Sequence, residues 1–449
     1  MRFASTWRAG AIAISAGAAA VAPAQQAPPV HGGERLAPFW EACRTRRADV
    51  LCLGDSNQLH RAAGWDDAVS FVMSEEFGLY ATGLHPLGEN EGFGAGIGLG
   101  STTLNTAGGP GCAYAGAPAS AVARLDTEVS GLAPHNYLFV AEGSEVLGGV
   151  AAGMTLTAES PLTLAAALRF HVTFATFAGS GPGGFDPGVR VDTVPPQFLA
   201  RPGVISTRGE DGVGRAAIDL PAGQRSGSVS LRLAADAQAK VIGPFVGYFA
   251  RAERPGVERG VSVHTLYGKG GQSARDMALA LQSASDQTLV MVLTEATSLQ
   301  SGPRVAMVRI CTGLNDRGEP LGSLGPEPQT PGGSAGAYAD NLHAIVARLE
   351  QAWALAGFEP QNLYLVITPS HPVPGADDEP LKLYRRTAED VARNHPRAAS
   401  VDLARVVSVA ELEKNSWYVT QGDYNHLRRD GARAVYRREL DSLLEASKP

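Results

Sequence analysis

The chain alternates between two hydrophobic patterns, and this alternation is what most constrains its fold. Residues 36–80 and 260–447 repeat the order of apolar strand, small polar corner and amphipathic helix, which predicts a mostly parallel, doubly wound α/β sheet. In residues 168–175, by contrast, apolar side chains alternate with Arg169, His171 and Thr173, and this period of two recurs across residues 136–251. Such strands, separated by Gly and Pro turns, predict a β-sandwich. We therefore expect a β-sandwich inserted into an α/β domain.

The changes of pattern place the domain boundaries. We expect residues 36–82 to form the first part of the α/β domain, residues 83–255 a Gly-rich connection and the inserted sandwich, and residues 256–449 the second part of the α/β domain. The glycines of the connection do not lie between a strand and a helix, so they do not predict a dinucleotide site. We expect the last strand at residues 401–407, while the apolar run 288–293 has no predicted place in the sheet.

The first residues have the order of a secretory signal peptide. Arg2 and Arg8 precede an Ala-rich stretch of residues 10–22, and Ala22-Pro23-Ala24 resembles a cleavage site. No apolar run reaches the roughly 18 residues that a membrane span needs. We therefore expect residues 1–24 to be a signal peptide and the mature chain to be exported, either periplasmic or extracellular. A disordered cytosolic tail is the alternative.

Charge and cysteine content exclude several classes of protein. The net charge is −7 without a basic cluster, which argues against a nucleic-acid partner. The four cysteines lack the spacing of a zinc site or a disulfide framework, and we expect no metal or cofactor. Cys52 and Cys311 lie in apolar runs and are expected to be buried thiols. Cys43 and Cys112 either remain free or pair in an oxidising compartment.

The first predicted strand ends in a corner suited to a nucleophile. Apolar residues 50–53 are followed by Gly54-Asp55-Ser56. In an open α/β sheet, functional groups collect at the carboxyl ends of the strands. A tight corner that glycine permits can lift the Ser56 hydroxyl out of the core there. Asp and Ser are also good N-caps, so a simple helix start is the alternative.

Two later corners carry the groups that a serine nucleophile needs. Asp423 and His426 are three residues apart, so the carboxylate can meet one imidazole nitrogen while the other takes the proton of Ser56. Asn315 follows another strand and can donate its side-chain amide to a developing oxyanion, as can the backbone N–H groups of Gly271 and Ser56. The alternatives are a helix cap, a surface histidine and an Asn-containing turn.

With these corners in this order, the sequence resembles the SGNH hydrolases, also called GDSL-type esterases. The resemblance covers residues 36–80 and 260–447 and implies a flavodoxin-like α/β sheet. It lies in four blocks of sequence. The first three follow the first, second and third predicted strands of the α/β part, and the fourth precedes its last helix: Gly54-Asp55-Ser56, Gly268-Lys269-Gly270-Gly271, Gly313-Leu314-Asn315-Asp316 and Asp423-Tyr424-Asn425-His426-Leu427. The predicted sandwich lies outside it.

The resemblance implies a catalytic triad. Ser56 is the expected nucleophile, His426 the general base and then acid, and Asp423 the group that orients His426. The implied oxyanion hole consists of the backbone N–H groups of Ser56 and Gly271 with the side chain of Asn315.

The sequence departs from the family pattern in two ways. The second block is a loose match, so Gly270 or Gly268 could stand in the place of Gly271. The first and second blocks are separated by far more chain than a usual crossover connection, and an inserted domain explains that distance.

The implied activity is hydrolysis of an ester, with acetyl or short acyl groups on a carbohydrate as the expected substrate. Glycan binding by the inserted sandwich is expected by analogy of fold alone. One alternative is a carbohydrate O-acyltransferase with the same triad, and another is a non-catalytic glycan-binding protein. A lipase is less favoured because the sequence has no apolar lid helix.

Three further features of the sequence bear on the predicted site. His371, in the segment TPSHPVPG, could line the same cleft, although an ordinary loop histidine is the favoured interpretation. His60 is expected to serve packing or substrate contact. The Pro- and Gly-rich loop of residues 317–333 closely follows Asn315 and is expected to shape the substrate site.

Overall fold

The computed structural model describes most of the α/β part and selected β segments of the chain. The described residues are 28–55, 65–86, 96–97, 100–105, 112–113, 138–140, 153–157, 166–176, 184–185, 188–191, 197–200, 205–206, 212–223, 228–232, 245–268, 273–316, 335–375, 378–420 and 422–448. The expected signal peptide of residues 1–24, Ser56, His60, Gly270, Gly271 and the loop of residues 317–333 lie outside these ranges.

The central sheet has six strands in the order β1-β20-β19-β18-β2-β17. Its strands are β1 (Val30–His31), β2 (Arg47–Gly54), β17 (Gly260–Gly268), β18 (Ala306–Cys311), β19 (Leu363–Ile367) and β20 (Ala398–Val401). All neighbours pair in parallel except β1, which is antiparallel to β20. Counting the parallel strands along the chain gives the order 2-1-3-4-5, which is the flavodoxin-like arrangement. The expected doubly wound α/β sheet is confirmed.

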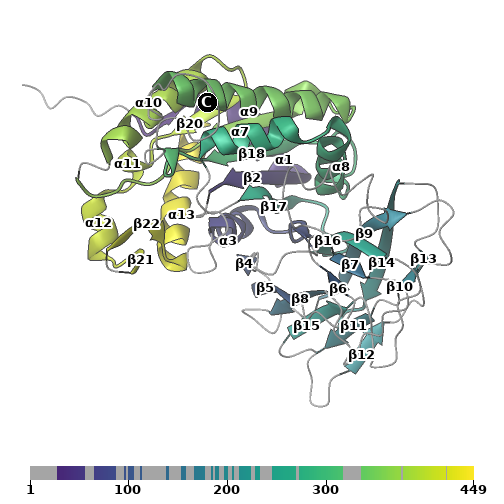
Figure 1. Cartoon of the computed structure of the whole chain (residues 1–449). Helices are drawn as coiled ribbons and strands as arrows, with labels where there is room; N and C mark the ends of the chain where they lie inside the picture. Colours follow the sequence, from purple (N-terminus) through teal and green to yellow (C-terminus); the bar gives the residue numbers. More distant parts are fainter. Residues whose placement is uncertain are drawn as a thin grey trace, which may run out of the picture.

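Helices cover both faces of this sheet (Figure 1). The alternating side chains of β2 divide between two cores: Leu51 and Leu53 pack in one, and Val50 and Cys52 in the other. The first core also receives α7 (Ala274–Ser283), α8 (Asp286–Thr297), α9 (Ala335–Leu355) and α10 (Asp378–Arg393). The second receives α1 (Ala37–Thr45), α3 (Trp65–Phe77) and α13 (Arg429–Ala446). Helices on both faces are what strands buried on two sides require.

The structure assigns the apolar run 288–293, which had no predicted place, and corrects the strand expected at residues 401–407. The apolar run 288–293 belongs to α8, whose N-terminus is capped by Ser285: its hydroxyl accepts the N–H of Thr288 at 3.1 Å. The last strand of the central sheet is β20, which ends at Val401, so the prediction of a strand at residues 401–407 is wrong. Asp402 accepts the N–H of Ala404 at 3.0 Å and starts the short helix α11 (Leu403–Val406). A further short helix, α12 (Val409–Lys414), follows it.

The segment between the two halves of the α/β part forms antiparallel sheets. One sheet has the order β12-β11-β15-β8-β5-β4 and the other β14-β9-β16-β7-β6, with β3 also paired to β16. In β9, Leu168, Phe170, Val172 and Phe174 are buried, which is the face that the period of two predicts. Residues of β11 and β12 contact β14 of the other sheet, so the extra β-rich part is confirmed. The strands are β3 (His85–Pro86), β4 (Gly96–Ile97), β5 (Gly100–Asn105), β6 (Cys112–Ala113), β7 (Leu138–Val140), β8 (Gly153–Thr157), β9 (Leu168–Thr176), β11 (Gly188–Val191), β12 (Gln197–Ala200), β14 (Gly212–Leu220), β15 (Ser228–Arg232) and β16 (Phe245–Glu253), with the separate pair β10 (Gly184–Phe185) and β13 (Ile205–Ser206).

Charged contacts join the β9–β14–β16 sheet to the α/β part. Glu253 of β16 accepts hydrogen bonds from His171 of β9 and from Arg47 of β2, both at 2.8 Å. Thr173 of β9 donates to the buried carboxylate of Glu295 in α8 at 3.0 Å. Because these groups are largely buried, losing one partner would leave a charge without compensation. The contacts therefore fix the sheet against β2 and α8.

The cysteines of the α/β part are reduced. Cys43, Cys52 and Cys311 are buried free thiols, so the alternative in which Cys43 forms a disulfide is not realised. Burial raises the pKa of Cys43 well above its ordinary value and that of Cys311 to about 12, which keeps both protonated and unreactive.

Within the described ranges, none of the helices combines the length and the apolar character needed to cross a bilayer.

Candidate active site

Three of the four sequence blocks begin at the same edge of the central sheet. In the parallel register, Gly54 at the end of β2 pairs with Gly268 of β17 on one side and with Cys311 of β18 on the other. Asp55, the residue after β2, is buried. The carboxyl ends of these strands are therefore level with one another, at the edge where α/β folds place their functional groups.

The corner after β18 is built around a buried carboxylate. Asp316 accepts the backbone N–H of Gly313 at 3.0 Å, and both of its oxygens accept the N–H of Ala274 at 3.1 Å. Gly313 has a φ of 103°, which a residue with a side chain adopts only with strain. Since Ala274 begins α7, directly after the second block, Asp316 ties the third block to the second. Asn315 sits between these anchored residues and is half-buried.

The fourth block forms one strand of a hairpin. β21 (Tyr418–Thr420) and β22 (Asp423–Leu427) pair antiparallel, and Gly422 in the turn has a φ of 94°. Nδ1 of His426 lies 3.0 Å from Oδ2 and 3.2 Å from Oδ1 of Asp423. The contact that the three-residue spacing allows is thus present, and it forms within β22, in a hairpin whose pairing contains a register shift.

Electrostatics favour one protonation pattern for this pair. Partial burial would raise the pKa of Asp423, but hydrogen bonds from His426 and from the N–H of Asn425, at 3.0 Å, outweigh it and hold the pKa below its usual value. An ionised carboxylate only accepts hydrogen bonds, so Nδ1 of His426 carries the donated proton. In the neutral imidazole the lone pair then belongs to Nε2, as a general base requires.

A second histidine holds this hairpin in place. His371 follows β19 and is fully buried; its Nε2 lies 3.1 Å from the carbonyl oxygen of Tyr424, and its Nδ1 lies 3.3 Å from the Ser370 hydroxyl. Tyr418 of β21 donates to the carbonyl oxygen of Pro372 at 3.3 Å. The corner after β19 is therefore bonded to both strands of the hairpin. An ordinary loop histidine was the favoured interpretation of the sequence, and its burial against Tyr424 had no local sequence signal.

The structure brings together only part of the predicted site. Asp423 and His426 are in contact, and Asn315 stands at the carboxyl end of β18. Ser56 and Gly271 lie outside the described residues, so their approach to His426 and Asn315 remains a prediction. Among the described residues, no group of three or more His, Cys, Asp and Glu side chains is arranged to hold a metal ion.

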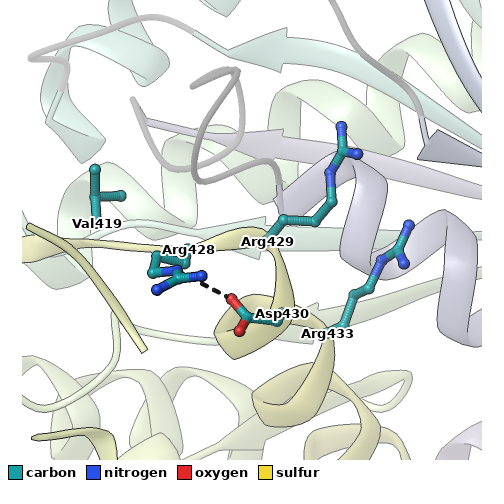
Figure 2. Close-up of a pocket in the computed structure, with 5 residues that line it drawn as sticks. All are labelled: Val419, Arg428, Arg429, Asp430 and Arg433. Atoms are coloured by element: carbon teal, nitrogen blue, oxygen red, sulfur yellow. Dashed lines mark ion pairs between the residues drawn. The ribbon is translucent and has the colours of Figure 1, made fainter. Parts of the chain in front are cut away.

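A cavity of about 550 Å³ lies beside the hairpin (Figure 2). It is lined by Val419 of β21, Arg428 at the end of the hairpin, and Arg429, Asp430 and Arg433 of α13. The sequence LRRDGARAVYRREL contains these arginines, but their gathering around a cavity follows from the turn between β22 and α13. No local signal in the sequence points to this feature.

Comparison with known proteins supports the fold. The sequence matches no protein-family model and no curated protein. A solved structure described as a peptidoglycan O-acetylesterase is similar with a TM-score of 0.52 at 14% identity, covering 92% of this chain and 95% of that one.

Two carbohydrate esterases are more weakly similar. Est24, a carbohydrate acetylesterase from Sinorhizobium meliloti, has a TM-score of 0.28 at 14% identity over 41% of this chain and 79% of its own. A family two carbohydrate esterase from Cellvibrio japonicus has a TM-score of 0.26 at 12% identity, covering 78% of this chain and 99% of its own. Similarities with TM-scores this low carry no weight. The similarity to the peptidoglycan O-acetylesterase, at 14% identity, is evidence about the fold and not about the activity. The chain therefore shares a fold with that peptidoglycan O-acetylesterase, and its own fold is a flavodoxin-like α/β sheet combined with an additional β-rich part.

Proposed function

We propose that the protein is an exported serine esterase that removes acetyl or short acyl groups from a carbohydrate. The observation that carries this proposal is the contact between His426 and Asp423, 3.0 Å apart on a hairpin fixed to the carboxyl edge of the sheet. Asp55 directly follows β2 at that same edge, and the proposed nucleophile Ser56 is the next residue in the chain. The fold shared with a peptidoglycan O-acetylesterase is in keeping with ester chemistry on a glycan.

The proposed mechanism has two acyl-transfer steps. Asp423 accepts the Nδ1 proton of His426, and Nε2 takes the proton of Ser56 as its oxygen attacks the ester carbonyl. The resulting oxyanion receives hydrogen bonds from the N–H groups of Ser56 and Gly271 and from the side chain of Asn315. His426 then passes the proton to the leaving alcohol. Water, activated by the same imidazole, releases the acyl group from Ser56.

In this proposal, different segments of the chain have different roles. Residues 1–24 direct export, residues 36–82 and 256–449 form the esterase domain, and residues 83–255 form an inserted sandwich that binds glycan. In support, the described strands from β3 to β16 belong to antiparallel sheets, while β2 and β17 on either side of them belong to the parallel sheet. An inserted domain of this kind leaves the hydrogen bonding of the host sheet undisturbed.

The test compares Ser56→Ala with the wild type on a small aryl acetate and on a panel of acetylated glycans. Ser283→Ala is the matched control, because Ser283 is exposed at the end of α7. We expect Ser56→Ala to lose nearly all turnover and labelling by a fluorophosphonate, and Ser283→Ala to keep both. Equal activity of Ser56→Ala and wild type would falsify the assignment. Wild-type protein that neither labels nor hydrolyses any ester would favour a glycan-binding protein, and acyl transfer to an added acceptor sugar would identify an acyltransferase.

A further inference from the structure

The helix that follows the β21–β22 hairpin is bonded to the central sheet by a buried ion pair. Arg309 of β18 donates from Nε to Oε1 of Glu439 in α13 at 3.0 Å, and from Nη2 to Oε2 at 2.8 Å. Both side chains are almost completely excluded from solvent. Burial would lower the pKa of Arg309, but the carboxylate of Glu439 outweighs it and raises that pKa, so the guanidinium stays charged. The contact is therefore a charged fork of two parallel hydrogen bonds inside the core.

This fork lies close to the edge of the sheet that carries the proposed site. Arg309 is two residues before Cys311, which pairs with Gly54 at the end of β2. Two residues of strand span about 7 Å. Thr368, the residue after β19, donates its hydroxyl to Oε1 of Glu439 at 2.8 Å. Glu439 is therefore bonded both to β18 and to the end of β19.

The N-terminal end of α13 carries the hairpin. β22 and α13 are separated only by Arg428, whose N–H donates to the carbonyl oxygen of Trp417 at 2.7 Å. Trp417 immediately precedes β21. A Cβ at position 431 would lie 2.5 Å from the Cβ of Trp417, so Gly431 lets the base of the hairpin lie directly against the first turn of α13. A displacement of α13 along the sheet would therefore move the hairpin, and His426 with it.

A charged fork restricts the position of a helix more closely than apolar packing does. Its two parallel bonds form only when the guanidinium and the carboxylate face each other in one plane. Replacing a buried ion pair by apolar side chains of similar volume is often neutral or stabilising, because the two charges no longer have to be desolvated. The fork between Arg309 and Glu439 is therefore better explained by the position that it imposes on α13 than by a gain in stability.

We propose that Arg309 and Glu439 are positioning residues of the esterase, whose fork sets the place of α13 on the sheet and so holds His426 against the corners that follow β2 and β18. The inference rests on the proposed function and adds to it two residues that do not touch the reacting groups. A misplacement of about 1 Å at reacting groups can cost on the order of 100-fold in rate. A shift of α13 by less than one residue of helix rise would be enough.

An apolar replacement of the whole cluster separates position from stability. The variant is Arg309→Met/Glu439→Leu/Thr368→Val, which removes both charges of the pair together with the hydroxyl that donates to Glu439. We expect its melting temperature to stay near that of the wild type. Its kcat on a small aryl acetate should fall about 10- to 100-fold. KM should change little, because no substrate contact is altered. A wild-type kcat in this variant overturns the inference, since the fork would then serve the fold alone.

Arg309→Lys is the second variant, and it decides the question if the apolar variant does not fold. It keeps the opposite charges but replaces the planar fork by one rotatable ammonium, so we expect kcat to fall about tenfold with KM unchanged. Arg437→Met is the matched control, because Arg437 is a more exposed arginine of α13 that pairs with Glu75 of α3 at 2.6 Å. Such exposed pairs contribute little. Equal kcat in Arg309→Lys and Arg437→Met overturns the inference while leaving the esterase proposal intact.

Hydrogen exchange tests the fork without any substrate. Amide exchange in β21 and β22 should be faster in the apolar variant than in the wild type, or in Arg309→Lys if the apolar variant does not fold. Exchange in α10, which packs in the other core, should be unchanged. If the wild type hydrolyses no ester, the esterase proposal fails, and faster exchange in the hairpin still supports the action of the fork on its position. Equal exchange in the hairpins of variant and wild type overturns that action, whether or not the wild type is active.

Discussion

His371 is joined through its Nε2 to the carbonyl oxygen of Tyr424, 3.1 Å away, inside the segment that carries Asp423 and His426. The two residues are 53 positions apart in the chain, since His371 follows β19 and Tyr424 lies in β22. A hydroxyl near Nδ1, that of Ser370, allows a neutral imidazole in which Nε2 donates and Nδ1 accepts. His371 is thus a positioning residue for the proposed catalytic pair.

His371→Ala is expected to lower kcat about tenfold with little change in KM, because the hairpin loses an anchor while the substrate pocket keeps its groups. His371→Gln, which retains a donor near the same place, should recover part of kcat. His343→Gln changes an exposed histidine of α9 and serves as the control. The measurement is steady-state kinetics with melting temperature; a fall in melting temperature with kcat intact would mean that His371 only stabilises the fold.

Asp423→Asn is expected to reduce kcat by about 10²- to 10⁴-fold, because an amide can donate to Nδ1 and favour the wrong tautomer of His426. The lowered pKa of Asp423 means that the wild-type carboxylate is already ionised at pH values above its usual range. Wild-type activity should therefore not report a titration of Asp423 between pH 5 and 8. Asp441→Asn, at an exposed position of α13, should stay within a few-fold of wild type. Comparable losses in both variants would speak against a specific role for Asp423.

Asn315→Ala is expected to lose on the order of 100-fold in kcat, the usual effect of removing one oxyanion donor. The loss should appear in kcat more than in KM, because the charge on the oxygen develops only in the transition state. Asn362→Ala, in an exposed turn before β19, is the control. A change confined to KM would place Asn315 in substrate binding instead.

Asp316→Asn is expected to destabilise the protein and to reduce turnover together. The carboxylate accepts the N–H groups of both Gly313 and Ala274, and an amide would turn a donor toward one of them. Hydrogen bonds to a charged group are worth about 1.5–3 kcal/mol, so a fall of several degrees in melting temperature is expected. Asp340 is exposed on α9, and Asp340→Asn should change neither the melting temperature nor the turnover. An unchanged melting temperature would show that the corner does not depend on this carboxylate.

Acidification should loosen the contact between the β9–β14–β16 sheet and the α/β part. The hydrogen bond from His171, together with Arg47, holds the pKa of Glu253 at about 2, below its ordinary 4.5. A lowered folded-state pKa gives stability that is complete above the unfolded value and is lost as the pH falls toward about 2. The difference in melting temperature between wild type and Glu253→Gln should therefore be largest at neutral pH and shrink below pH 4.5. Glu258→Gln, at an exposed site, is the control; a difference that stays constant with pH would contradict the assignment.

Much of the fold was determined by the sequence itself. Apolar segments followed by small polar corners identified β2 and β18, and the resemblance to the SGNH hydrolases implied the flavodoxin-like sheet. The period of two in residues 168–175 identified β9. The spacing of Asp423 and His426 made their contact possible, because a helix turn or a tight loop brings residues three apart together, and the contact is present. These features depend on local periodicity and on short-range geometry.

Tertiary structure decided the rest. The run 288–293 is as apolar as a strand, and the Ser285 cap together with packing against β2, α9 and β9 accompanies its folding as the helix α8. The burial of His371 depends on Tyr424, 53 residues later, and the orientation of Arg433 depends on Phe71, from a distant helix. Periodicity reports which face of an element is buried, but not which element covers it, because that choice is made by packing among segments far apart in the chain.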